Sequence, residues 1–421
     1  MSKKVLIIAY QFPPMGGSGV QRTSKFVKNL HHFGYEPIVL TRDTKDVSLL
    51  DESLLKDIPK ETKIYRTNAY DKSDSTKKSA IPSKIIGRKV LIPDQARLWE
   101  LSLHKKALKI IEDEKIDLIY TTSYPYSDHL LGLFIKKTLK GKVKWVCDFR
   151  DEWSNNPYTK DNPYSKSRMD KELKMESEVI KYADKLITNT PVMRQNFIDI
   201  HSLDEKRQED FFTIPNGYDK DDFSGLENIK PKNDKFTITY TGAMYGRRKP
   251  DYFFEAVQRL VESNEINIDR LSINFIGNYK RDALLDNIKK FGIDKCVIVH
   301  DYMPHKEALK KLVSSDALLL LEGGGVGSDA FYTGKVFEYM NTYRPVIAVL
   351  PYGCAFDIVN ETNIGETAYF ENIDEIKKVI LKFYEMWDRG EEYNEQNFEL
   401  IQSFERYELT KKLAEVFDSL V

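Results

Sequence analysis

Short apolar runs alternate with amphipathic stretches along this chain. Residues 5–9 are apolar and predict a buried strand, and apolar positions recur at helical spacing through residues 26–33. Gly34 ends that helix, and residues 37–41 form the next strand. This strand–helix repeat predicts an α/β fold with a parallel sheet and helices on both of its faces. The same alternation continues through residues 116–121, 130–137, 143–147, 172–182 and 185–188.

The alternation is interrupted in segment 219–235, which is rich in Asp, Lys and Asn, and restarts at residues 236–240. Because 421 residues exceed what one core usually organises, we expect two domains, residues 1–218 and 219–404. The last segment, about 405–421, has helical spacing and is a candidate to pack back on the first domain.

Composition narrows the class of protein. Hydrophobic residues make up 41% of the chain, and 64 Lys and Arg balance 65 Asp and Glu, which gives no reason to expect nucleic acid as a partner. Three cysteines without paired spacing favour a reducing compartment. The seven histidines lack metal-ligand spacing, and no apolar run reaches the roughly 18 residues of a spanning helix. We therefore expect a cytoplasmic protein, at most peripheral on the inner face of the membrane, with no metal and no cofactor.

A glycine-rich loop follows the first strand and includes Gly17 and Gly19. Glycines that lead into a helix expose backbone N–H groups beside the positive end of its dipole, which suits a phosphate. Six residues precede Gly16 after the strand, so the dinucleotide-binding spacing is not met. A plain turn is the alternative.

Two features of the second domain also suit a nucleotide diphosphate. Arg247, Arg248 and a lysine follow the strand at 236–240, at the edge where open α/β sheets bind ligands. A glycine-rich loop at 323–327 precedes a helix that starts near Thr333, and Glu338 in that helix could accept hydrogen bonds from two sugar hydroxyls. The alternatives are a solvated basic turn and a surface glutamate.

A polar cluster at residues 148–153 follows another predicted strand. Asp148, Arg150 and Asp151 are candidate catalytic groups, and a structural Asp–Arg pair is the alternative. Further candidates on the preceding loop and helix are Ser123, Tyr124 and His129.

Five motifs in this order resemble the retaining GT-B glycosyltransferases of the large, family 4-like group that builds bacterial surface polysaccharides and glycolipids. They lie at residues 13–17, 183–188, 214–219, 240–242 and 335–340. The resemblance implies two facing Rossmann-like domains with an interdomain cleft, in which residues 1–218 form the acceptor side and residues 219–404 bind the nucleotide-sugar. It also implies transfer of a sugar, with retention and without a metal, from a nucleotide-sugar donor to a lipid-linked or saccharide acceptor; a UDP-sugar is the expected donor.

The resemblance implies a role for each matching position. Arg247 and Arg248 hold the diphosphate as it leaves, and Glu338 binds the ribose hydroxyls. The base lies near residues 300–303 and is read through backbone groups. The remaining donor-binding positions are Gly17, Gly19, Tyr302, Met303, Thr333, Gly334 and Lys335.

One position departs from the family pattern. Many members carry two glutamates with seven residues between them, and the first falls at Ala330 here. Ala330 cannot make that contact to the sugar, so Asp329 or backbone groups must substitute. Two other assignments stay open: a nucleotide-sugar epimerase of the same architecture, and a non-catalytic nucleotide-sugar-binding subunit.

Segment 77–92 combines five cations with interleaved isoleucines. Such a segment suits an anionic bilayer surface, where each cation contributes about 1 kcal/mol, and it predicts docking beside a lipid-linked acceptor. A solvated insertion is the alternative. The cations are Lys77, Lys78, Lys84, Arg88 and Lys89.

Overall fold

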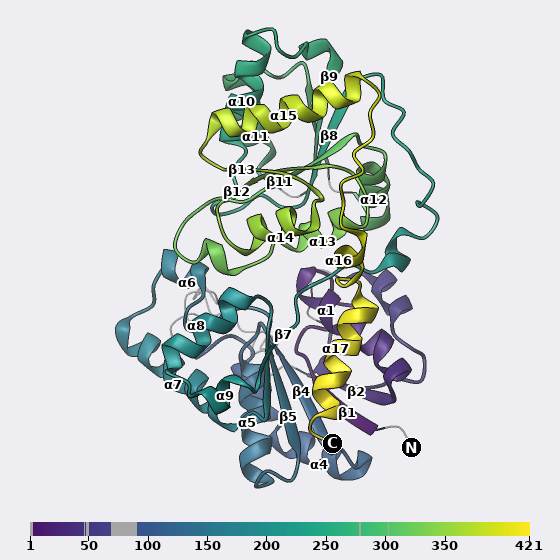
Figure 1. Ribbon diagram of the computed structural model, residues 1–421. Helices are drawn as coiled ribbons and strands as arrows, with labels where there is room; N and C mark the ends of the chain where they lie inside the picture. Colours follow the sequence, from purple (N-terminus) through teal and green to yellow (C-terminus); the bar gives the residue numbers. More distant parts are fainter. Residues whose placement is uncertain (1–2, 46, 48–49, 69–90, 278, 302) are drawn as a thin grey trace, which may run out of the picture. The chain divides into compact units, whose positions relative to one another are not determined.

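The computed structural model describes residues 3–45, 47, 50–68, 91–277, 279–301 and 303–421 (Figure 1). The chain divides into two compact units: Met1–Pro215 with Arg406–Val421, and Asn216–Glu405. The cations of segment 77–92 and the candidate Tyr302 lie outside the described residues. Among the helices that are described, none has the length and apolarity needed to cross a bilayer.

The described part of the first unit contains a seven-stranded sheet in the order β3-β2-β1-β4-β5-β6-β7. Every pairing between neighbouring strands is parallel. The first six strands follow the 3-2-1-4-5-6 order of a Rossmann fold, in which the chain reverses direction across the sheet between β1 and β4. The strands are β1 (Lys3–Ile8), β2 (Tyr35–Arg42), β3 (Lys63–Thr67), β4 (Leu118–Ser123), β5 (Lys144–Phe149), β6 (Lys185–Thr188) and β7 (Phe211–Thr213).

Helices cover both faces of this sheet. Leu6 and Ile8 belong to one core, whereas Val5 and Ile7 belong to the other. Because both faces are buried, β1 is a continuous apolar run rather than an alternating one. The helices are α1 (Ser18–Asn29), α3 (Arg97–Ser102), α4 (His104–Glu114), α5 (Ser127–Thr138), α6 (Pro157–Asp161), α7 (Lys166–Tyr182), α8 (Pro191–His201) and α9 (Glu205–Gln208), with short 3-10 turns η1 (Leu30–Phe33) and η2 (Glu52–Asp57).

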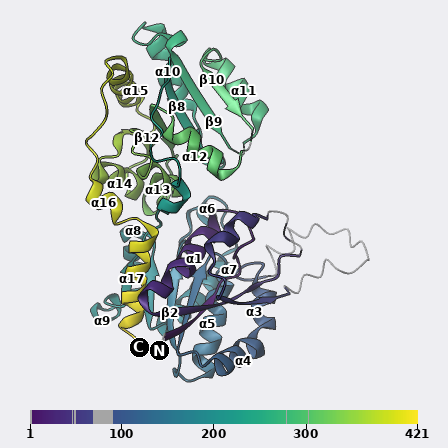
Figure 2. The same ribbon diagram turned by 90° about the vertical axis from the view of Figure 1, so that its right-hand side faces the viewer.

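The C-terminal helix α17 (Arg406–Asp418) returns to this unit and packs beside α1, as both views show (Figures 1 and 2). Phe417 is fully buried and meets the rings of Tyr35 and Tyr120 edge-on, at centroid distances of 5.2 and 6.1 Å. Asp418 accepts hydrogen bonds from Lys3 at 2.9 Å and from the Tyr35 hydroxyl at 2.8 Å. The last helix therefore completes the core of the first unit.

The second unit repeats the same strand order in a six-stranded parallel sheet, β10-β9-β8-β11-β12-β13, over its described residues. Its reversal point lies between β8 and β11. The strands are β8 (Phe236–Thr241), β9 (Leu271–Ile276), β10 (Val297–His300), β11 (Ala317–Leu321), β12 (Val346–Leu350) and β13 (Gly365–Tyr369).

Helices again pack on both faces of this sheet, around two apolar cores. The predicted α/β class with two Rossmann-like parallel sheets is confirmed. The helices are α10 (Asp251–Glu262), α11 (Arg281–Lys290), α12 (His305–Val313), α13 (Gly334–Met340), α14 (Cys354–Thr362), α15 (Ile373–Asp388) and α16 (Phe398–Gln402), with 3-10 turns η4 (Lys220–Phe223), η5 (Ile268–Arg270) and η6 (Ser328–Ala330).

Candidate active site

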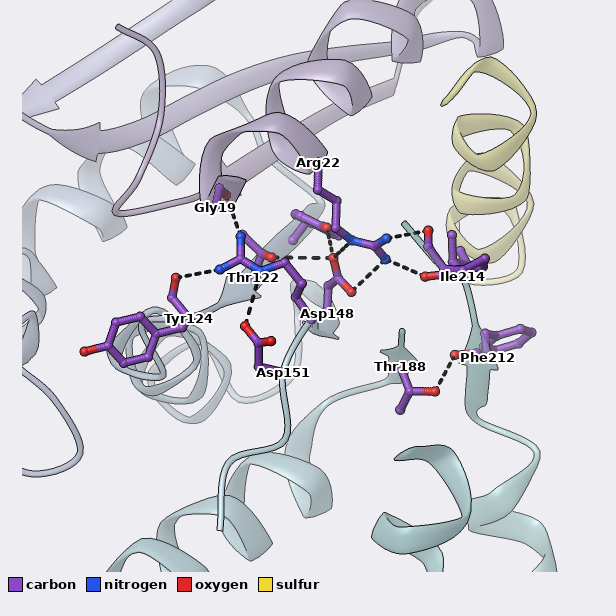
Figure 3. A network of polar contacts seen from close by, with 12 residues as sticks. Gly19, Arg22, Thr122, Tyr124, Asp148, Asp151, Thr188, Phe212 and Ile214 are labelled. Atoms are coloured by element: carbon purple, nitrogen blue, oxygen red, sulfur yellow. Dashed lines mark hydrogen bonds and ion pairs between the residues drawn. The ribbon is translucent and has the colours of Figure 1, made fainter. Parts of the chain in front are cut away.

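The polar cluster of the first unit is centred on a buried ion pair. Asp148, at the end of β5, is fully buried and accepts hydrogen bonds from Arg22 Nε at 2.7 Å and Nη2 at 3.0 Å (Figure 3). The Tyr120 hydroxyl donates to the same carboxylate. Arg22 also donates to the carbonyl oxygens of Ile214 and Pro215, at 2.9 and 2.8 Å. Burial opposes the charge of Arg22, but the Asp148 carboxylate outweighs burial and raises the Arg22 pKa.

These contacts tie α1 to β5 and to the chain that follows β7. Because the Asp148 carboxylate is buried and already bonded to two side chains, it is not open to a substrate. In this structure Asp148 anchors α1 to β5, and the catalytic role expected from the sequence stays a prediction.

Arg150 meets the glycine loop of the first unit. Its Nη1 donates to the Gly19 carbonyl at 2.5 Å, its Nε to Asp151 at 3.3 Å, and its Nη2 to the Tyr124 carbonyl at 3.4 Å (Figure 3). A Cβ at Gly19 would lie 2.2 Å from Gln11 Oε1, so the Gln11 side chain would have to shift for a larger residue there. Gly17 forms the N-cap of α1 with φ 108°, a left-handed conformation that favours glycine. Four of the sequence candidates, Gly17, Gly19, Arg150 and Asp151, therefore gather at the reversal point of this sheet.

Arg248 is held inside the second unit by a residue that the sequence analysis did not single out. Its Nη2 forms an ion pair with Glu322 at the end of β11, and its Nη1 donates to the Ala243 carbonyl at 3.1 Å. The two side chains are 9% and 7% exposed. Burial lowers the pKa of Arg248, but the Glu322 carboxylate outweighs this and raises it. Glu322 could not have been paired with Arg248 from the sequence because 74 residues separate them and they meet only once β8 and β11 are neighbours.

The glycine-rich loop after β11 is shaped around Arg247. A Cβ at Gly323 would lie 2.1 Å from the Arg247 carbonyl oxygen, and one at Gly325 would lie 2.4 Å from the guanidinium carbon. Arg247 Nη1 donates to the Val326 carbonyl at 3.1 Å. Gly325 thus leaves space for the Arg247 guanidinium, and Gly323 leaves space for the backbone of the same residue.

Lys335 lies against the end of β8. A Cβ at Gly242, where φ is 116°, would lie 2.1 Å from the Lys335 amine. Burial and the nearby Arg248 guanidinium lower the pKa of Lys335 to about 8, against opposing attraction from Glu338 and Glu322. Gly242 therefore leaves space for a half-buried amine beside a second cation.

Glu338 lies one helical turn beyond Lys335, on α13. Its Oε1 is 2.9 Å from His305 Nε2, and the two side chains are 36% and 47% exposed. His305 begins α12 and was not singled out from the sequence, because no spacing pattern connects it with Glu338. Thr333 is buried, Gly334 is exposed at the start of α13, and Met303 is half-buried near the end of β10. Ala330 is buried, whereas its neighbour Asp329 is exposed.

Both clusters lie at the reversal point of a Rossmann-like sheet, where ligands of such sheets bind. Residues 18–222 match the model of a family described as Glycosyltransferase Family 4. This segment is a family 4 glycosyltransferase domain. The family resemblance that the motifs indicated is thereby confirmed. No curated protein matches the sequence.

Solved structures share the fold over nearly the whole chain. A glycosyltransferase from Rickettsia africae ESF-5 is 14% identical, with a TM-score of 0.66 over 99% of this chain and 98% of that one. A structure of trehalose-6-phosphate from E. coli, bound with UDP-2-fluoro glucose, is 11% identical, with a TM-score of 0.65 over 100% of both chains. A proposed UDP-N-acetylglucosamine 2-epimerase from Listeria monocytogenes is 13% identical, with a TM-score of 0.56 over 100% of this chain and 96% of that one. The family 4 domain is thus part of a chain with the GT-B fold.

Proposed function

We propose that the protein is a glycosyltransferase that moves a sugar from a nucleotide-sugar, most simply a UDP-sugar, to a lipid-linked or saccharide acceptor. The observation that carries this proposal is the cationic group at the β8–β11 reversal point. Arg247, Arg248 and Lys335 gather there, and Glu338 follows one turn later. A diphosphate with its ribose presents the complementary chemistry, since it carries two negative phosphates beside a pair of hydroxyls.

Each side chain has a distinct role in the proposed reaction. The bond between the anomeric carbon and the diphosphate oxygen breaks, and the acceptor hydroxyl forms the new bond and loses its proton. Negative charge grows on the departing diphosphate, where Arg247 and Lys335 stabilise it. Arg248 is paired with the buried carboxylate of Glu322, so it positions the loop after β8 and also contributes charge. Thr333 and Gly334 add backbone N–H groups, and Glu338 accepts the two ribose hydroxyls.

The remaining candidates complete the donor and acceptor contacts. Met303 belongs to the region proposed to hold the base. Gly17 and Gly19 are assigned to the diphosphate, and Arg150 with Asp151 to the hydroxyls of the donor or acceptor. Asp329, exposed beside the buried Ala330, takes the sugar contact that Ala330 cannot make. Retention of the anomeric configuration and independence of metal belong to the same proposal.

The test is a calorimetric screen of UDP-, GDP- and dTDP-sugars, followed by NMR of any donor that binds. A transferase releases the nucleoside diphosphate slowly even without acceptor, and a retaining one releases the sugar first as the donor's own anomer. EDTA should leave the rate unchanged. Conversion of the nucleotide-sugar to its epimer would instead indicate an epimerase, and binding without turnover would indicate a non-catalytic subunit.

For the acceptor, we propose that segment 77–92 binds an anionic membrane surface, on the evidence of its sequence. Co-sedimentation with vesicles should need anionic lipid and weaken with added salt. A variant with its five cations changed to Gln should lose this binding. Equal binding to neutral vesicles, or binding to neither kind, would favour an acceptor in solution.

A further inference from the structure

Aromatic rings gather where β12 and β13 end in the second unit. The rings of Tyr352 and Tyr369 stack with their centroids 4.9 Å apart and their planes 20° apart. Phe356 packs edge-on against Tyr352 at 5.0 Å, and Tyr252 packs edge-on against Phe370 at 5.9 Å. Tyr352 is 60% exposed and Tyr252 is 38% exposed. An aromatic side chain this exposed, yet held in a stack, presents a rigid ring surface to a ligand.

Two close approaches join this aromatic group to the proposed donor site. A Cβ at Gly324, in the glycine-rich loop, would lie 2.6 Å from a ring carbon of Phe370. A Cβ at Gly353, next to Tyr352, would lie 2.3 Å from the Cα of Asp329. The aromatic group is thus continuous with the loop that holds Arg247 and with the residue assigned to the donor sugar.

The order of the strands in the sheet indicates how a bound donor would lie across it. Across this sheet the order is β10-β9-β8-β11-β12-β13. The proposed base region follows β10, and the cations for the diphosphate follow β8 and lie in the first turn of α13. A donor laid from base to diphosphate therefore points its sugar toward β12 and β13. The rings of Tyr352 and Tyr369 come next along that line.

The chemistry around the rings favours a neutral, hydroxyl-rich ligand. Two exposed carboxylates lie beside them: Asp329 is close to Gly353, and the Tyr252 hydroxyl is 3.5 Å from Glu371 Oε1. These carboxylates repel a phosphate or an anionic lipid surface but accept hydrogen bonds from sugar hydroxyls. The C–H face of a pyranose ring is apolar and suits an aromatic face.

We propose that Tyr352 and Tyr369 form a subsite for a pyranose ring of a saccharide acceptor, next to the donor sugar. This inference rests on the proposed transferase function and names the chemistry of its second substrate. The acceptor then presents a sugar ring to this unit, whatever carries that sugar at its far end.

The test uses saturation-transfer NMR on the full chain with UDP present and a panel of neutral disaccharides: lactose, cellobiose, maltose and N,N′-diacetylchitobiose. We expect Tyr352→Ala to weaken binding of the responding disaccharide about three- to tenfold, which is the size of one aromatic stacking contact. Tyr352→Phe should keep the affinity because it keeps the ring. Affinity for UDP should stay the same in both variants.

The matched control is Tyr343→Ala. Tyr343 is 46% exposed and lies 5.5 Å from the Phe398 ring, but it precedes β12 and so belongs to the opposite edge of the sheet. Absence of binding by any disaccharide, or equal losses in the Tyr352→Ala and Tyr343→Ala variants, would overturn the subsite. Donor turnover measured on the same samples distinguishes a failure of the subsite proposal from a failure of the transferase proposal. Intact turnover with unchanged saccharide binding refutes the subsite alone, whereas absent turnover refutes the transferase.

Discussion

At the scale of single residues, two neighbouring cations of the second unit have different electrostatic surroundings. Glu322 raises the pKa of the buried Arg248, despite an opposing effect of burial. Burial and the charge of Arg248 lower the pKa of Lys335 to about 8. Lys335 thus carries a positive charge that the folded chain does not fully compensate, which is what an anion-binding group needs.

This electrostatic difference predicts a pH dependence. The Lys335 ammonium is present below its pKa of about 8 and is lost above it, so affinity for UDP should fall as pH rises from 7 to 9.5. Lys335→Met should bind UDP more weakly at pH 7 and show little of this fall. Calorimetry measures the affinity for UDP of the unmodified protein and of Lys335→Met across this pH range. Lys249→Met is the control, because Lys249 is an exposed cation next to Arg248. A native affinity that is flat across this range would contradict the assignment.

The two arginines should differ in what their loss does to folding. Arg248→Ala leaves Glu322 buried without its partner, so we expect a loss of about 3–5 kcal/mol in stability together with lost activity. Arg247→Ala removes a half-buried side chain with a carbonyl contact, so the melting temperature should change little. Its kcat should fall more than its donor KM rises, since charge grows on the leaving group. Thermal unfolding and donor kinetics on both variants check this, and a pure KM effect would limit Arg247 to ground-state binding.

Glu338 tests the ribose contact. Replacing it with Ala should weaken UDP binding by about 1–3 kcal/mol, the usual size of a lost charge-assisted hydrogen bond. Glu395→Ala provides a control at an exposed carboxylate elsewhere in the unit. Unchanged affinity for UDP in Glu338→Ala, measured by calorimetry, would remove this assignment.

The candidate site shows how far single residues could be predicted from the sequence. Arg247 and Glu338 became candidates because Arg247 follows the end of a strand and Glu338 belongs to a motif. Their partners were not found, because Glu322 and His305 come close only through the pairing of strands and the packing of helices far apart in sequence. The partner of Asp148 was missed for the same reason, because Arg22 lies 126 residues away.

At the scale of elements, central strands were predictable, whereas three of the four edge strands of the described sheets were not. The runs at 5–9 and 236–240 correspond to β1 and β8, which lie inside their sheets, are buried along most of their length, and consist mainly of apolar, β-branched and aromatic residues. The sequence analysis passed over β3, β7 and β13, three outer strands of mixed or short pattern. An edge strand pairs along one side only and keeps polar residues, so its apolar signal is weak.

The C-terminal helix is the element whose place matters most for stability. Phe417→Ala should cost the first unit about 3–5 kcal/mol, because it removes a fully buried ring between Tyr35 and Tyr120. Glu415→Ala, on the exposed face of the same helix, should stay within about 0.5 kcal/mol. Urea unfolding compares the two variants. Equal losses would mean that α17 contributes little to the core of this unit.

At the scale of the whole molecule, the alternation of apolar strands and amphipathic helices determines the fold, whereas we expect the loops to determine the chemistry. The similar structures share 11–14% of residues with this chain and still match over 96–100% of their lengths. They include a glycosyltransferase and a proposed epimerase, so the fold alone does not select the reaction. We expect the loops that follow β8 and β11 to decide the reaction.

The most direct measurement is donor turnover by the full chain without acceptor. Nucleotide-sugars from the calorimetric screen are incubated with the protein in EDTA, and release of nucleoside diphosphate and free sugar is followed by NMR. We predict slow release from the donor that binds, strongly reduced in Arg247→Ala and unaffected by Glu395→Ala. Failure of every nucleotide-sugar to bind, or binding with no release of nucleoside diphosphate by the unmodified protein, would contradict the proposal that this chain transfers sugars.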